Sequence, residues 1–180
     1  HDRGCAGNFG FAAAATGGSA TFTWTTNETA TSQLELGTDP ASLSVVASDS
    51  ALVTNHSITV SGLSLATTYY YRVTSVDGAS NSATFPEATA PAASFATPTP
   101  LVSIADASVT EGNSGTTIRS FVVTVSAASS QTASVSYTTL NGTAVGGSDF
   151  VAGSGTVAFN PGETSRTIEG TVNGDTAGEG

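Results

Sequence analysis

The stretch "ATFTWTT", residues 20–26, decides the fold class. Ala20, Phe22 and Trp24 alternate with threonines, so in an extended chain the apolar side chains share one face and the hydroxyls the other. A period of two is typical of a β-strand with one buried face. No segment shows the sustained period of an amphipathic helix. The sequence therefore predicts an all-β protein.

Similar stripes recur in both halves of the chain, between breaks rich in Gly, Asp, Asn and Pro. Between the halves, the Pro- and Ala-rich segment 85–100 restricts the backbone and marks a domain junction. We predict an N-terminal tail at 1–7, a domain at 8–97, a linker at 98–100 and a second domain at 101–180. The stripes are His56, Ile58 and Val60; Tyr69, Tyr71 and Val73; Phe121, Val123 and Val125; Val135 and Tyr137; Val157 and Phe159; and Ile168 and Val172.

Charge and composition exclude several functions. The chain has four arginines, no lysine and fourteen acidic residues, which gives a formal net charge of -10. This charge argues against nucleic acid as a partner, because phosphate binding needs clustered cations. No apolar run is long enough for a signal peptide or a membrane span. The Ser-, Thr- and Gly-rich composition favours a secreted or cell-surface protein. The chain begins with His1, which indicates a processed or partial form.

A single cysteine, Cys5, excludes an internal disulfide. Two interpretations remain for it. Cys5 is a free thiol in a polar tail, or it forms a disulfide with another chain or with a missing part of this one.

The first half resembles a fibronectin type III domain in "ATFTWTT" and "HSITVSGLSLATTYYYRV", residues 56–73. The resemblance implies an immunoglobulin-like (Ig-like) β-sandwich with Trp24 and Tyr69 buried, the Tyr69 hydroxyl bonding upstream backbone as a tyrosine corner. His56 and "YYYRV" also resemble small modules in front of bacterial metallophosphatase domains. Hydrolytic metal sites need several His and carboxylate ligands that converge on the ion, and this chain has only two histidines, so we predict that His56 is a strand residue with satisfied hydrogen bonds.

The second half resembles a Calx-beta domain, because four motifs agree in order and spacing. The resemblance implies a second Ig-like sandwich with calcium as a cofactor, bound at one end by Glu111, Asp149, Asp175 and Glu179. Asn141 stands where the family commonly has Asp, which predicts a weak site. The alternative is that Asp149 caps its own turn. The motifs are "LVSIADASVTEGNSGTT", "YTTLNGTAVGGSDF", "GSGTVAFNPGETSRTIEGTV" and "NGDTAGEG".

The sequence stops before the closing strands of the Calx-beta pattern, so we expect an incomplete second sandwich with exposed strand edges. Other copies of the chain, or neighbouring domains of a longer chain, are the expected partners. The apolar segment "NFGFAAAAT", residues 8–16, is either a strand donated to another subunit or the first strand of its own domain.

Three sequons, at Asn27, Asn55 and Asn141, have the acceptor pattern for N-linked glycans and are expected on loops or strand ends. They matter only if the source glycosylates its surface proteins.

The sequence contains no phosphate-binding loop, nucleophile elbow, catalytic carboxylate pair or Cys/His metal spacing, which argues against an enzyme. The sequence therefore indicates a structural or adhesive extracellular protein, either a subunit of a surface filament or a module of a larger adhesin. The alternative is an accessory region of a larger secreted hydrolase, such as a metallophosphatase or a glycan-degrading enzyme.

Overall fold

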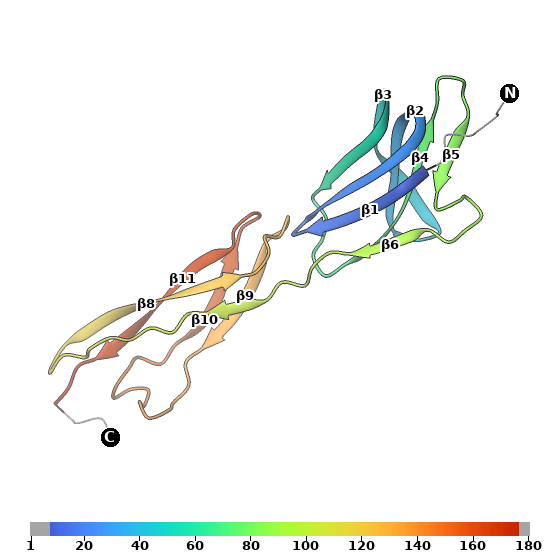
Figure 1. Ribbon diagram of the computed structural model, residues 1–180. Coiled ribbons are helices and arrows are strands. Elements are labelled where there is room, and N and C mark those ends of the chain that lie inside the picture. Colours follow the sequence, from blue (N-terminus) through green and yellow to red (C-terminus); the bar gives the residue numbers. More distant parts are fainter. Residues whose placement is uncertain (1–7, 177–180) are drawn as a thin grey trace. The chain divides into compact units, whose positions relative to one another are not determined.

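The computed structural model describes residues 8–176, and within them every regular element is a β-strand (Figure 1). The chain divides into two compact units between Thr99 and Pro100. The predicted all-β fold, with two tandem sandwiches, is confirmed.

The first unit is an antiparallel arrangement built around the long β2–β3 hairpin (Figure 1). One side of β2 pairs with β1 and then with β4, and β4 also pairs with β5 and β6. The segment 8–16 is therefore the first strand of its own unit. The strands are β1 (Asn8–Thr16), β2 (Ser19–Asp39), β3 (Ser42–Ser61), β4 (Thr68–Val76), β5 (Ser82–Phe85) and β6 (Ala93–Ala96).

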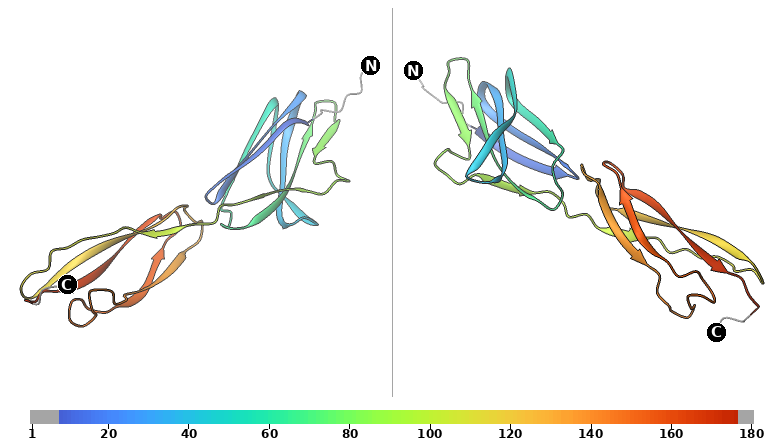
Figure 2. Two further views of the ribbon diagram at one scale, coloured as in Figure 1. Left: turned by 60° about the horizontal axis from the view of Figure 1, so that its bottom comes forward. Right: turned by 180° about the vertical axis from the view of Figure 1, so that it is seen from behind.

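An irregular segment divides β2 into two halves with different neighbours (Figure 2). Residues 19–26 pair with β1, whereas residues 33–37 pair with β4. The ladder between β2 and β3 shifts register between Thr25 and Ser32, at the point where the partners change. Bulges bend strands. The two halves of one strand thereby contribute to opposite layers of a sandwich.

The core of the first unit lies between these layers and follows the predicted alternation. Phe22 and Trp24 are 0% and 1% exposed, and Trp24 Nε1 donates a hydrogen bond to Ser75 Oγ at 2.9 Å. Tyr71 packs edge-on against the Phe22 ring. The buried apolar residues are Ala20, Phe22, Trp24, Leu34, Leu36, Ile58, Leu63, Tyr71 and Val73.

Tyr69 forms the expected corner. Its hydroxyl oxygen accepts the backbone N–H of Ser64 at 3.0 Å, and its ring stacks on Phe95 with centroids 5.7 Å apart. Thr97 fixes the same turn, because its hydroxyl donates to the Ser64 carbonyl at 2.7 Å. Tyr69 packs against the core but is half-buried, which corrects the expectation of a buried side chain.

The second unit contains a three-stranded sheet in the order β11-β8-β7 and a two-stranded sheet of β9 and β10. Its buried apolar residues are Val123, Val157 and Phe159. This core is much smaller than that of the first unit. The strands are β7 (Val102–Ile104), β8 (Thr116–Val125), β9 (Ala133–Thr138), β10 (Ser154–Phe159) and β11 (Ser165–Asn173).

Candidate functional site

Three loops that carry the predicted calcium ligands meet at one end of the second unit. Gly174 N–H donates to Gly115 O at 2.9 Å, which joins the loop of Asp175 to the loop of Glu111. Asn173 N–H donates to Asp149 O, also at 2.9 Å. Backbone hydrogen bonds therefore bring the loops together.

The carboxylates themselves do not gather into a metal site. Across residues 8–176, no group of three His, Cys, Asp or Glu side chains could hold a metal ion. Glu179, the fourth predicted ligand, lies outside the described residues, as does Cys5. Calcium needs six to eight oxygen ligands, and the described carboxylates do not fit it.

Asp149 instead closes its own turn. Its Oδ2 accepts the Val145 N–H at 2.5 Å, and its own N–H donates to Val145 O at 2.9 Å. Hydrogen bonds from Val145 N–H and then from Ser148 hold the pKa of the Asp149 carboxyl below its usual value. Asn141 Oδ1 supports the same loop by accepting Gly146 N–H at 2.8 Å. This is the arrangement of a turn cap.

We expect Asp149→Ala to lower the melting temperature of the second unit by a few degrees, because the Val145 N–H loses its acceptor. The loss should be equal in calcium and in a chelator, as followed by circular dichroism. The carboxylate has a lowered pKa, so its contribution is present above about pH 3.8 and is lost as pH falls through the folded-state value. Asp106→Ala removes an exposed acid of the same unit and serves as the control. A loss seen only in calcium would contradict the turn-cap role.

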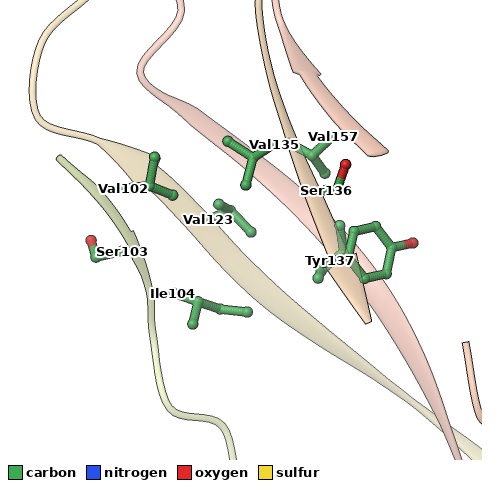
Figure 3. Close-up of a pocket in the computed structure, with 9 residues that line it drawn as sticks. Val102, Ser103, Ile104, Val123, Val135, Ser136, Tyr137 and Val157 are labelled. Carbon is green, nitrogen blue, oxygen red and sulfur yellow. The ribbon is translucent and has the colours of Figure 1, made fainter. Parts of the chain in front are cut away.

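A second candidate site is an open apolar groove between the two sheets of this unit (Figure 3). Its volume is about 220 Å³. Val102 and Ile104 of β7 lie on one side, and Val135 and Tyr137 of β9 lie on the other. Although they line the groove, Val102 and Ile104 are 43% and 56% exposed. The core layer is therefore uncovered beside β7.

The strand edges beside the groove are unprotected. Within the described part of the chain, β7 ends its sheet, and β9 and β10 pair only with each other. None of these three strands contains a charged residue. Natural proteins commonly blunt free edges with charges or proline. The groove and its uncharged edges thus have the character of a strand-binding surface, and the sequence signal for it is this lack of charge.

The three sequon asparagines are all exposed. Asn27 lies in the irregular segment of β2, and Asn141 lies in the loop capped by Asp149. Asn55 is paired with Thr25 inside the β2–β3 ladder. The expectation of loops or strand ends is therefore wrong for Asn27 and Asn55, because β2 and β3 run through these positions.

Fold and sites together define a tandem of two β-sandwich modules. Residues 98–180 match the Calx-beta domain family, which confirms the predicted resemblance. Residues 10–97 match the purple acid phosphatase N-terminal domain family. Both families are non-catalytic modules. No curated protein matches the chain. No helix in residues 8–176 is long and apolar enough to cross a membrane.

The match of the first unit corrects the prediction of a fibronectin type III domain. Trp24 and Tyr69 carried that prediction. A core tryptophan and a tyrosine corner occur across Ig-like sandwiches. These two residues therefore indicate only the fold class. The predicted resemblance to modules in front of metallophosphatase domains agrees with the family that residues 10–97 match.

Proposed function

We propose that the chain is a non-enzymatic structural and adhesive protein, secreted or on the cell surface, whose copies associate through the open side of the second unit. The observation that carries this proposal is the exposure of Val102 and Ile104 in a groove that they line. Full burial of a valine or isoleucine side chain contributes about 1.5–3 kcal/mol. Covering each of these half-exposed side chains therefore contributes about 1 kcal/mol.

A second copy suits this surface because it offers the same uncharged edges. β9 has the sequence "ASVSYT", and antiparallel pairing of two such edges buries no charge. A two-stranded sheet is marginal by itself, so added strands stabilise it. The net charge of -10 opposes association at long range. Salt screens that repulsion, so we expect salt to strengthen the assembly.

The test measures the mass of the full chain by analytical ultracentrifugation over a range of concentrations and salt. We expect wild-type mass to rise with both. Ser136→Lys places a charge on β9 at the groove and should weaken association at least tenfold. Ser120→Lys makes the same charge change on β8, the central strand of the other sheet, and should leave association unchanged. A chain that stays monomeric, or equal effects of the two variants, would exclude the proposal.

A second candidate function is an accessory region of a larger secreted phosphatase. The match of residues 10–97 to the purple acid phosphatase N-terminal domain supports it. A catalytic domain in the full-length gene would favour this function over assembly. Calcium as a ligand of the second unit is supported by the Calx-beta match alone, because the described carboxylates do not form a site.

A further inference from the structure

The bend in β2 is held by one side chain of the neighbouring strand. His56 of β3 is 2% exposed and lies opposite Trp24. Its Nε2 is 2.9 Å from Thr26 Oγ1, and its Nδ1 is 2.8 Å from Ser32 Oγ. Thr26 precedes the irregular segment and Ser32 follows it. His56 therefore joins the two ends of the bend, and the predicted satisfied histidine is confirmed.

The hydrogen bonds fix the tautomer of the imidazole. Thr26 Oγ1 donates its single hydrogen to the Glu28 carbonyl at 2.6 Å, so it accepts from His56. Nε2 must then carry the proton. Nδ1 has a lone pair and accepts the Ser32 hydroxyl hydrogen. The neutral ring satisfies both hydroxyls.

Protonation of the imidazole changes this arrangement. A proton on Nδ1 would face the hydrogen of the Ser32 hydroxyl, which would have to turn and find another acceptor. The Trp24 ring covers the imidazole, parallel to it at 4.9 Å. A positive charge in this position is buried and lacks an anionic partner.

The nearby acidic residues do not supply that partner. On β3, Asp49 lies opposite Ser32, but it is exposed and its carboxylate accepts the Ala51 N–H. On β2, Glu28 is exposed and contacts the cluster through its backbone carbonyl. After β4, the Asp77 carboxylate already accepts hydrogen bonds from Ala79 N–H and from the backbone and side-chain N–H groups of Asn81. Burial is accordingly the cause that lowers the pKa of His56 below 6.5.

We propose that Thr26, Ser32 and His56 form an acid-sensitive latch, which on protonation of His56 releases the bend of β2 and loosens the cover over Trp24. The neutral imidazole stabilises the closed bend fully above pH 6.5, the usual pKa of histidine. This stabilisation is lost as pH falls from 6.5 through the lower folded-state pKa. Carboxylates with lowered pKa values, such as Asp77, titrate only at more acidic pH.

The test follows the full chain between pH 8 and 4.5. Trp24 is the only tryptophan and stacks on His56, so its fluorescence reports the latch directly. We expect one transition below pH 6.5. Hydrogen-exchange protection factors of the amides at 26–32 should fall by up to about tenfold per pH unit across it. Nuclear magnetic resonance of the imidazole gives its pKa in the wild type.

His56→Gln supplies an N–H and a carbonyl oxygen without a group that titrates, and should abolish the transition. His1→Gln removes the other histidine and should retain it. A transition that persists in His56→Gln, or an imidazole pKa at or above 6.5, would overturn the proposal. So would fluorescence and protection that stay constant from pH 8 to 4.5 in the wild type, an outcome that needs no variant.

Discussion

Trp24→Ala is expected to lower the free energy of unfolding of the first unit by about 3–5 kcal/mol. The indole is 1% exposed, packs on His56 and donates to Ser75, so its removal leaves a cavity and an unpaired buried hydroxyl. Small domains have a total stability of about 5–15 kcal/mol, so the variant is close to unfolding. Thermal melts followed by circular dichroism measure the effect without needing the lost fluorophore.

Thr23→Ala is the matched control for this variant. Thr23 is the preceding residue of the same strand and is exposed. Surface changes of this kind alter stability by about 0.5 kcal/mol or less. If Trp24→Ala melted within a few degrees of the wild type, the central place of Trp24 in the core would be disproved.

Residues 101–180, expressed alone, are expected to give no cooperative melt as a monomer. Their buried apolar core is limited to Val123, Val157 and Phe159 among the described residues. Nine large apolar side chains of this unit are exposed, Val102 and Ile104 among them. Apolar burial must offset a conformational entropy of about 1–2 kcal/mol per ordered residue. Such a small core does not achieve this without a covering strand.

Circular dichroism and sedimentation of the fragment provide the measurement. Residues 8–99, which hold the larger core around Trp24 and Phe22, are expected to melt cooperatively as a monomer. A cooperative melt of monomeric 101–180, together with a dispersed amide spectrum, would show that the groove needs no cover. The assembly proposal would then lose its physical reason.

The sequence was sufficient to predict those features that depend on local pattern. Alternation of Ala20, Phe22 and Trp24 predicts which face of β2 is buried, because side chains along a strand point to opposite faces in turn. The Tyr69 corner was equally predictable, since its partner Ser64 is only five residues away. Four motifs at fixed spacing predicted the resemblance of the second unit to a Calx-beta domain, and the family match agrees.

Other features required the tertiary structure, because one residue type serves several roles. An aspartate at 149 suits a calcium site or a turn cap, and only its contact with Val145 N–H distinguishes them. The exposure of Val102 and Ile104 could not be predicted from the sequence for a related reason, because their alternating pattern is that of a buried strand.

The sequence by itself determined that this protein consists of two β-sandwich modules, because strand alternation and turn residues act between near neighbours in the chain. Only the tertiary structure decided that His56 joins Thr26 to Ser32 and that a groove stays open beside β7. Those features depend on which distant strands lie side by side. Pairing over such separations is set by packing of the whole unit, and local pattern does not encode it.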